Sequence, residues 1–389
     1  MKIKAKKIAV IFGTRPDTIK LAPVIQELCK FDQYFSLCLI ATAQHREMLD
    51  DVLSIFSIQP NYDLNVMTPS QSLSSLTQQM LEKLDYVLTM ENPDMIVVQG
   101  DTATTFTASL AAFYRKIPVL HIEAGLRTNN KRYPFPEEIY RRLTTHVADL
   151  HCTPTPNATK ALLREGISRK QIRCSGNTVI DALRANINPN YTFSHEQLNG
   201  IVAQKERIVV ITAHRRENWG EPLKNICLAI KTLAQKYSDV NFVFPIHLNP
   251  TVRKTVLEEL DGIRNIHLLA PLNYSDFINL IAQSYAVITD SGGLQEEAPS
   301  LGKPVLVLRE VTERPEAISF GTVRLVGTST KKIVETADKL LSNKKFYRSM
   351  SAAVNPYGDG RASERIVNVM MNHFGFSKKK MKEFFPRIP

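Results

Sequence analysis

Short apolar runs recur along the chain, and each is followed by a stretch with the spacing of an amphipathic helix. The runs do not alternate apolar and polar positions, so they predict strands that are buried on both faces. Strands alternating with helices predict parallel sheets covered by helices. We expect strands over residues 7–14, 35–43, 94–101, 118–125, 149–155 and 171–177, then over 207–215, 240–248, 265–271, 285–293, 304–310 and 323–327.

The two series of strands predict an α/β chain with two Rossmann-like, doubly wound domains that face a cleft. A length of 389 residues also favours two domains over a single core. The hinge is expected between Gly176 and Glu206, where ANINPNYTFSHEQ interrupts the pattern with Asn and Pro. We therefore expect an N-terminal domain over residues 1–177 and a C-terminal domain over residues 178–362.

Composition narrows the class of protein only slightly. Hydrophobic residues make up 43% and charged residues 22% of the chain, which is ordinary for a soluble globular protein. No run approaches the roughly 18 apolar residues of a membrane span, and the start, MKIKAKKIAVIFG, reads as a first strand rather than a signal peptide. The five cysteines are scattered without a CxxC pair, so neither a disulfide framework nor a metal site is indicated, and a reducing cytoplasm fits best.

The net charge of +11 is partly local. Residues 376–389 form a basic tail with five basic residues and one acid. We expect this tail to be a mobile, solvated terminus rather than a contact for membrane or nucleic acid. The remaining positive charge is consistent with a site for an anionic ligand, or with a solvated basic surface.

Polar residues follow most of the expected strands, at the edge of a parallel sheet where ligands bind. Ser291, Gly292 and Gly293 follow one strand, and the glycines would let backbone N–H groups approach an anion. Glu297, one turn later, could reach the hydroxyls of a ribose. The alternative is an ordinary helix cap at Ser291. The motif is not GxGxxG, so no nicotinamide cofactor is indicated.

Cations at other strand ends could complete a diphosphate site. Arg15 and Lys20 follow the first strand, and Arg314 lies in a later loop. His214 could bind phosphate or transfer a proton. Each of these side chains could instead be structural or simply exposed.

Three acids indicate the type of chemistry more clearly than the cations do. Asp101 and Glu123 follow apolar runs, and Glu137 follows the loop YPFP. Carboxylates near an anion site would weaken binding unless the chemistry needs them, so they suggest proton transfer. From spacing alone, Glu137 and its neighbour Glu138 are better explained as acids that stabilise a helix N-terminus.

The motifs in this order resemble those of the non-hydrolysing UDP-N-acetylglucosamine 2-epimerases. The segments that carry the resemblance are FGTRPDTIKLAPVI, TAQHREMLDDVL, QGDTATTFTASLAAFY, IPVLHIEAGLRT, YPFPEEIYRRL, GNTVIDAL, TAHRREN, PIHLNP, TDSGGLQEEAPSLGKPVLVLRE, TERPE and NPYGDGRAS. The resemblance implies a GT-B-like fold, with a C-terminal helix over residues 363–375 that crosses back to complete the first domain.

The resemblance also implies reversible conversion of UDP-GlcNAc to UDP-ManNAc without cofactor or metal. UDP is eliminated to leave a 2-acetamidoglucal and is then added back, and the product would serve surface polysaccharide synthesis. The implied catalytic residues are Asp101, Glu123, Glu137 and His214. The implied substrate contacts are Arg15, Lys20, Asp101, Glu123, His214, Leu272, Phe277, Ser291, Gly292, Gly293, Glu297 and Arg314. The family further implies a homodimer, and a second UDP-GlcNAc as an activator near Gln44 and Arg46.

Some positions depart from the family pattern. Asp17 and Thr18 stand where Glu and Ala are usual, and Tyr140 stands where Asn is usual three residues after Glu137. Three alternatives therefore stay open: a hydrolysing relative that releases free ManNAc, a 2-epimerase of another UDP-2-acetamido sugar, and a glycosyltransferase of the GT-B fold.

Overall fold

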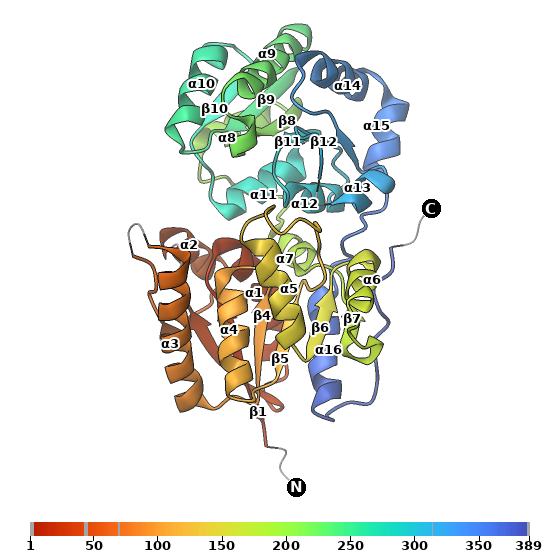
Figure 1. Ribbon diagram of the computed structural model, residues 1–389. Coiled ribbons are helices and arrows are strands. Elements are labelled where there is room, and N and C mark those ends of the chain that lie inside the picture. The colour runs from red at the N-terminus through yellow and green to blue at the C-terminus, as the bar shows by residue number, and fades with distance from the viewer. Residues whose placement is uncertain (1–3, 43–45, 69–70, 313, 387–389) are drawn as a thin grey trace. The chain divides into compact units, whose positions relative to one another are not determined.

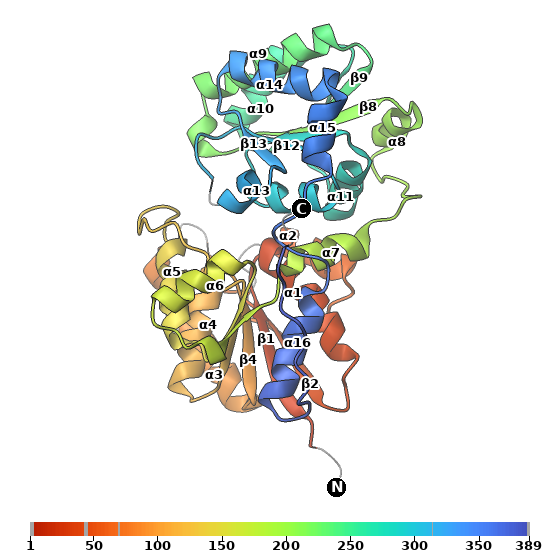
Figure 2. The same ribbon diagram turned by 90° about the vertical axis from the view of Figure 1, so that its right-hand side faces the viewer.

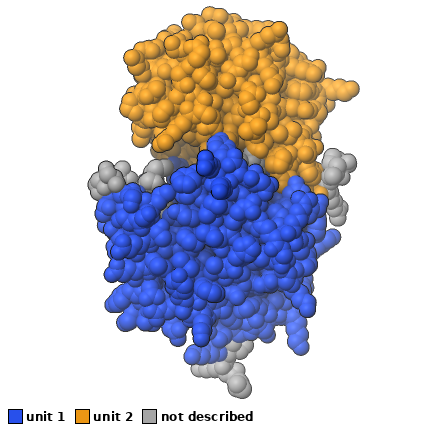
Figure 3. Space-filling model, in the orientation of Figure 1, with its two compact units in different colours: residues 1–182, 357–385 blue, residues 183–356, 386–389 orange. Residues whose placement is uncertain are grey.

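The computed structural model describes residues 4–42, 46–68, 71–312 and 314–386 (Figure 1). The chain forms two compact units, which Figure 3 colours separately. Unit 1 consists of residues 1–182 and 357–385, and unit 2 consists mainly of residues 183–356. The division falls within a helix that begins at Thr178, close to the boundary expected after residue 177.

Unit 1 contains a parallel sheet of seven strands in the order β3-β2-β1-β4-β5-β6-β7. Its strands are β1 (Lys6–Phe12), β2 (Phe35–Ala41), β3 (Tyr62–Asp63), β4 (Met95–Gln99), β5 (Val119–Ile122), β6 (Leu150–Thr153) and β7 (Ile172–Cys174). Its helices are α1 (Arg15–Cys29), α2 (Arg46–Ile55), α3 (Leu73–Glu91), α4 (Ala103–Tyr114), α5 (Glu137–Val147), α6 (Pro156–Arg164), the 3₁₀ turn η1 (Arg169–Gln171), α7 (Thr178–Asn186), which runs into unit 2, and α16 (Ala362–His373). Helices α3, α4 and α5 cover one face of this sheet, and α1 and α16 cover the other (Figures 1 and 2).

Unit 2 contains a parallel sheet of six strands in the order β10-β9-β8-β11-β12-β13. Its strands are β8 (Arg207–Thr212), β9 (Val240–Pro245), β10 (Ile266–Leu269), β11 (Ala286–Thr289), β12 (Val305–Val307) and β13 (Val323–Leu325). Its helices are α8 (Glu196–Ala203), the 3₁₀ turn η2 (Arg216–Asn218), α9 (Glu221–Lys236), α10 (Pro250–Leu260), α11 (Tyr274–Gln283), α12 (Leu294–Ser300), α13 (Pro315–Ser319), α14 (Thr330–Ser342) and α15 (Lys344–Ser351). Helices α9, α10 and α14 lie on one face of the sheet and α11 and α12 on the other (Figure 2).

The expectation of two doubly wound parallel sheets is confirmed, and each of the twelve expected runs contains a strand. The sequence pattern missed β3, because a strand of two residues is too short to show a periodicity. The strands are buried as the pattern predicted: β4, for example, is buried along its whole length.

The order of strands reverses at one point in each sheet, between β1 and β4 in unit 1 and between β8 and β11 in unit 2. Ligands of doubly wound folds bind beyond the carboxyl ends of the strands at such a switch point. The loops that follow these four strands begin at Gly13, Gly100, Ala213 and Asp290. The topology therefore places the polar residues of the sequence motifs at the two expected ligand positions.

Capping side chains set where the helices begin. The hydroxyl of Thr102 accepts a hydrogen bond of 3.3 Å from the N–H of Thr105 and begins α4, directly after Asp101. Thr14 begins α1 in the same way, through a longer contact of 3.5 Å from the N–H of Asp17. Both helices therefore start next to residues of the candidate site.

The C-terminal helix α16 belongs to unit 1 and packs on α1. The buried carboxylate of Asp181 caps α16: it accepts hydrogen bonds from the N–H of Ala362 at 3.2 Å, and from the N–H and the hydroxyl of Ser363 at 2.8 and 2.6 Å. The junction between α7 and α16 thus joins two segments far apart in the sequence.

The expectation of a mobile basic tail is wrong for its described part. The N–H of Phe384 donates to the carbonyl of Cys174 at 2.9 Å, and the Phe384 side chain is buried. The N–H of Met381 donates to the side chain of Asn368 on α16 at 2.8 Å. The segment after α16 therefore packs along β7, the edge strand of the sheet. Hydrophobic burial of Phe384 and satisfied backbone groups hold it there.

No helix in the described ranges is long and apolar enough to cross a membrane. The five cysteines are free thiols, and four of them are buried. Burial raises the pKa of Cys152 and of Cys227 to about 12, so these thiols are inert packing residues.

Candidate active site

Glu123 is an acid of unit 1 that is held through both of its carboxylate oxygens. It follows β5 with a left-handed φ of 61°, which turns its side chain back toward the switch point. The ammonium of Lys20 donates to both carboxylate oxygens, at 2.6 and 2.7 Å. The side-chain amides of Gln99 and Asn177 donate at 2.5 and 3.0 Å. These donors come from three other segments and fix the orientation of the Glu123 carboxylate.

Asp101 lies beside Glu123, at the end of β4. Arg141 of α5 donates to its carboxylate, and 28% of the Asp101 side chain remains exposed. Burial of the carboxylate raises the pKa of Asp101, and the negative charge of Glu123 raises it further, against the lowering effect of Arg141 and Lys20. A carboxyl group that holds its proton above the usual range is suited to general acid–base catalysis near neutral pH.

Asp17, which sequence reasoning did not select, forms a third carboxylate of this cluster. It lies in the first turn of α1 and is only 4% exposed. Burial raises its pKa to about 7, against the lowering effects of Thr14, Lys20 and Thr102. The hydroxyl of Thr102 donates to it at 3.1 Å. Asp17 is therefore a buried acid that titrates near neutral pH.

Gly100 lies next to the carboxylates of Asp17 and Glu123, and its backbone conformation favours glycine. Its φ of +74° is in the left-handed region, and a Cβ there would lie 3.4 Å from a carboxylate oxygen of Glu123 and 4.0 Å from one of Asp17. The carbonyl of Gly100 accepts a 2.7 Å hydrogen bond from Nε2 of His121. Burial lowers the pKa of His121 to about 3, so this histidine is neutral and supports the loop from inside the sheet.

Glu138, the neighbour of Glu137, is connected to this cluster through Arg141. Glu138 is completely buried and accepts hydrogen bonds from the N–H groups of Thr128 and Asn129, at 3.0 and 3.2 Å. It also pairs with Arg142 at 2.9 Å and with Arg141, which reaches Asp101. Burial alone would raise the pKa of Glu138, but these donors outweigh it and hold the pKa below the usual value. Glu138 thus fixes the loop that carries Glu137.

Tyr140 takes part in packing. Its ring stacks on Phe106 of α4, with centroids 5.3 Å apart and planes 10° apart. Both rings lie between α4 and α5, which are packed together. The substitution of a bulky residue for the family's usual Asn is therefore explained by contacts between helices.

The two cations expected to bind diphosphate from unit 1 differ in their surroundings. Lys20 is 17% exposed and ion-paired with Glu123. Arg15, the first residue of α1, is half-buried and makes no ion pair with the residues that the structure describes. Of the two, Arg15 is the one free to contact an anion.

In unit 2, His214 follows β8 and is held by Asp290, which follows β11. The completely buried Asp290 accepts from the N–H groups of His214 and Arg215, both at 2.8 Å, and from the amide of Asn218 at 3.0 Å. Nδ1 of His214 lies 3.3 Å from the other carboxylate oxygen. Burial lowers the pKa of His214, against the raising effect of Asp290. The His214 ring also stacks on His247, with centroids 5.5 Å apart.

Arg314 lies over the glycine turn of unit 2. A Cβ on Gly292 would come within 2.6 Å of the Arg314 guanidinium, so a larger residue there would displace this cation. Glu296, buried in α12, accepts from Nε of Arg314 at 2.6 Å. Thr312 helps to hold the same loop, because its hydroxyl donates to Gln295 at 2.5 Å and accepts from the N–H of Arg314 at 3.1 Å. The cation and the turn expected to bind an anion are thus adjacent.

The remaining residues expected in the site are Glu297, Ser291, Leu272, Phe277, Gln44 and Arg46. Glu297 lies on α12, with a carboxylate oxygen 3.5 Å from a Cβ built on Gly293, and Ser291 begins the same turn. Leu272 and Phe277 are half-buried and follow the edge strand β10. Gln44 lies outside the described residues. Arg46 begins α2, and its side chain is not described.

Sequence reasoning missed the residues that position the expected acids and His214. Asp17 was noted only as a departure, and Asp290 lies within a quoted motif without having been selected. Gln99, Asn177 and Arg141 lie within quoted motifs but carry no chemistry on their own. A signal was available for Asp290, since it follows a strand at the switch point, as His214 does. The contacts to Glu123 and Asp101 come from positions 24 to 103 residues away and could not be read from spacing.

The fold defines the chain as an α/β protein of the GT-B-like type, with two doubly wound parallel sheets and a polar cluster at each switch point. The sequence profile of the family described as UDP-N-acetylglucosamine 2-epimerase matches residues 27–371. The chain belongs to this family.

Individual relatives agree over almost the whole chain. The UDP-N-acetylglucosamine 2-epimerase of Bacillus subtilis is 47% identical, over 98% of this chain and 99% of the relative. A solved structure titled S. aureus MnaA-UDP has a TM-score of 0.89 at 45% identity, covering 98% of this chain and 100% of that one. The structure of the Neisseria meningitidis enzyme bound to UDP-GlcNAc has a TM-score of 0.86 at 48% identity, covering 94% of this chain and 100% of that one.

The raised pKa of Asp17 predicts a pH-dependent stability. Unfolded Asp loses its proton near pH 3.8, whereas folded Asp17 keeps it until about pH 7. The folded state binds more protons in this window, so Asp17 makes folding less favourable as pH rises through it. We expect the gain in free energy of unfolding from Asp17→Asn to be roughly 3 kcal/mol larger at pH 8 than at pH 5, because each pH unit between 5 and 7 adds about 1.4 kcal/mol. Urea denaturation at both pH values measures this difference.

The exposed Asp32 provides a matched control, because Asp32→Asn removes one carboxylate from the same unit without changing the buried cluster. A difference between wild type and Asp17→Asn that stays constant from pH 5 to pH 8 contradicts the assignment.

Proposed function

We propose that this protein is a UDP-N-acetylglucosamine 2-epimerase of the non-hydrolysing kind, which interconverts UDP-GlcNAc and UDP-ManNAc. The observation that carries the proposal is the cluster of Asp17, Asp101 and Glu123 around Lys20 at the switch point of unit 1. Such a group of acids suits proton transfer at carbon. The relatives whose structures contain UDP or UDP-GlcNAc support the substrate class.

The reaction begins with removal of the proton on C2 of the sugar by a carboxylate. The electrons of the C–H bond form a C1–C2 double bond as the C1–O bond to UDP breaks, and UDP leaves with that bonding pair. A 2-acetamidoglucal remains. A proton is then delivered to the opposite face of C2 while UDP adds back to C1. Asp101, with its raised pKa, and Glu123, with its fixed carboxylate, provide two acids with different environments for these steps.

Negative charge develops on the diphosphate as the C1–O bond breaks. Arg314, which is held against Gly292 by Glu296, is a fixed positive charge beside the turn that would bind it. His214, oriented by Asp290, adds a hydrogen-bond donor. Groups that are already oriented before the reaction stabilise a developing charge without reorganisation, so we assign them to catalysis as well as to binding. The UDP-ManNAc formed would supply ManNAc units for surface polysaccharide.

Solvent isotope incorporation tests the reaction. Incubation with UDP-GlcNAc in deuterated water, followed by NMR, should give UDP-ManNAc with deuterium at C2, and deuterium in both epimers with time. Free ManNAc with an equal amount of UDP would instead show the hydrolysing reaction. Absence of both turnover and exchange would rule out UDP-GlcNAc as substrate. A sigmoidal dependence of the rate on UDP-GlcNAc would support activation by a second nucleotide.

Removal of the acids tests the proton-transfer assignment. We expect Asp101→Asn, Glu123→Gln and Glu137→Gln each to lower kcat by about 100-fold with smaller effects on UDP affinity, because general acid–base catalysis contributes about that much. Steady-state kinetics and UDP titration measure the two effects. Glu82→Gln on the exposed face of α3 is the control and should turn over normally. The assignment fails if all three variants keep near-normal kcat.

We also propose that the protein forms a homodimer through α3 and α4. Tyr86 and Met90 of α3 are each 66% exposed, and Phe113 and Tyr114 at the end of α4 are 58% and 63% exposed. The ion pair between Asp85 and Arg115 brings these two groups of apolar side chains together. An exposed apolar patch of this kind is typical of an interaction surface.

Charge placed in this patch should disrupt the dimer. We expect Tyr86→Glu/Phe113→Glu to elute as a monomer in size-exclusion chromatography with light scattering, while the wild type is dimeric. Leu163→Glu/Leu248→Glu puts the same charges on exposed leucines elsewhere and should stay dimeric. A monomeric wild type, or a dimeric double variant, contradicts the proposal.

A further inference from the structure

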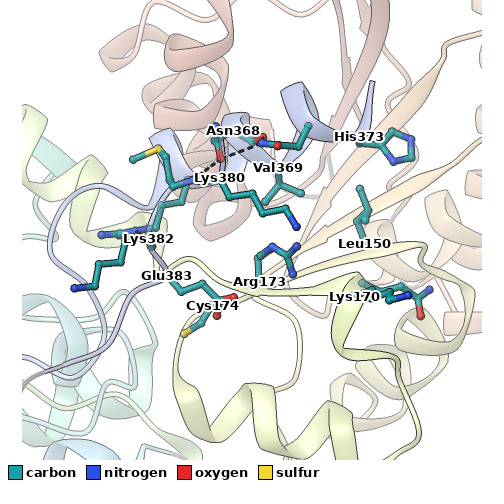
Figure 4. Close-up of a pocket in the computed structure, with 14 residues that line it drawn as sticks. Leu150, Lys170, Arg173, Cys174, Asn368, Val369, His373, Lys380, Lys382 and Glu383 are labelled. Atoms are coloured by element: carbon teal, nitrogen blue, oxygen red, sulfur yellow. Dashed lines mark hydrogen bonds between the residues drawn. The ribbon is translucent and has the colours of Figure 1, made fainter. Parts of the chain in front are cut away.

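Unit 1 contains a recess rich in charge, formed between β7, α16 and the segment that follows α16 (Figure 4). Its volume is about 270 Å³. Five cationic side chains and one acid line it; they are Lys170, Arg173, Arg365, Lys380, Lys382 and Glu383. The recess lies along the edge strand, whereas Asp101 and Glu123 follow β4 and β5 in the middle of the sheet. It is therefore separate from the acids of the candidate active site.

The walls of this recess are held by specific contacts. Arg365 of α16 is 9% exposed; its Nε donates to the carbonyl of Lys382 at 3.0 Å, and another of its nitrogens donates to the carbonyl of Ser175. The side chain of Asn368 donates to the carbonyl of Lys379 at 2.9 Å. These bonds fix the backbone that carries Lys380 and Lys382. The basic residues thus lie on an anchored segment, not on a free tail.

The positive charge in the recess is largely uncompensated. Glu383 is engaged by Arg169, at 2.7 and 2.9 Å, and by the N–H of Cys174 at 3.2 Å. Arg365 is paired with Asp359, at 2.7 and 2.6 Å. By contrast, Lys170, Arg173, Lys380 and Lys382 form no ion pair with any residue that the structure describes.

Two of these cations converge inside the recess. In Figure 4 the amino group of Lys380 and the guanidinium of Arg173 both point into the space between α16 and β7. Arg173 is half-buried on β7, and one of its nitrogens donates to the carbonyl of Ile172 at 2.8 Å. Like charges in a recess repel each other unless an anion lies between them, because the surrounding protein screens them less than water does.

We propose that this recess binds a small phosphate-bearing anion of the size of a diphosphate or a simple phosphate ester. A guanidinium offers paired donors to phosphate oxygens, and an ammonium adds a compact point charge. Among the described residues the lining contains no Phe, Tyr or Trp, and its aromatic ring is the imidazole of His373, so charge rather than base stacking dominates the recess. An anion there joins β7 to the C-terminal segment and stabilises unit 1.

Pyrophosphate is the probe, with the protein kept in saturating UDP so that the proposed substrate site is occupied. We expect pyrophosphate to bind in calorimetry and to raise the melting temperature, as any ligand specific for the folded state does. Arg173→Ala/Lys380→Ala should weaken this binding by at least about tenfold, because hydrogen bonds to charged groups are lost. Turnover of UDP-GlcNAc should be unchanged, since neither residue belongs to the catalytic cluster.

The control variant removes one arginine and one lysine from another part of the protein. Arg324→Ala/Lys332→Ala changes two exposed cations of unit 2 and should bind pyrophosphate as the wild type does. Lys380→Glu provides a second test that spares the Arg173 hydrogen bond, and it should abolish binding without loss of thermal stability. Equal losses in the pocket and control variants would show diffuse electrostatic attraction and overturn the proposal. So would the absence of binding to wild type, or binding to anionic phospholipid vesicles that pyrophosphate does not displace.

This test is separable from the proposed function. If the protein neither binds UDP nor turns over UDP-GlcNAc, the pocket and control variants still decide whether the recess holds pyrophosphate. If the recess fails, the isotope experiment is unaffected.

Discussion

The ion pair between Lys20 and Glu123 is the interaction on which the candidate active site of unit 1 depends. It joins α1, which follows β1, to the end of β5, and so spans the point where the strand order reverses. Lys20 also lowers the pKa values of Asp17 and Asp101 against the effect of burial. Three carboxylates so close together would otherwise repel each other strongly. Lys20, together with Arg141 at Asp101, makes the cluster compatible with a folded protein.

Unit 2 also positions its polar groups by charge, but there the buried partner is an acid rather than a cation. There a buried acid, Asp290, gathers the backbone N–H groups that begin the loop of His214, and Glu296 holds Arg314 over Gly292. In unit 1 a cation orients acids, and in unit 2 acids orient cationic or neutral donors. Each unit thus places reactive groups by charge-assisted bonds to a buried partner, which are stronger and more directional than bonds between neutral groups.

The C-terminal segment shows how tertiary contacts can change the role of a charged stretch. Its lysines have the composition of a disordered tail, yet α16 and β7 satisfy its backbone and bury Phe384. Composition gives the number of charges in a segment, but it does not show which hydrogen-bond partners distant segments provide. The edge of the sheet is covered as a result, and the basic side chains line a recess.

The sequence by itself determined the fold class, the twelve main strands and the positions of the polar strand ends, because burial on both faces leaves continuous apolar runs. It also indicated the candidate residues Asp101, Glu123 and His214, since residues at strand ends meet at one edge of a parallel sheet. Only the tertiary structure decided that Asp17 and Asp290 act with them, that Lys20 pairs with an acid, and that Glu138 is tied to the cluster. These features depend on burial and on contacts between segments far apart in the chain, and burial is what moves a carboxyl pKa such as that of Asp17 to about 7.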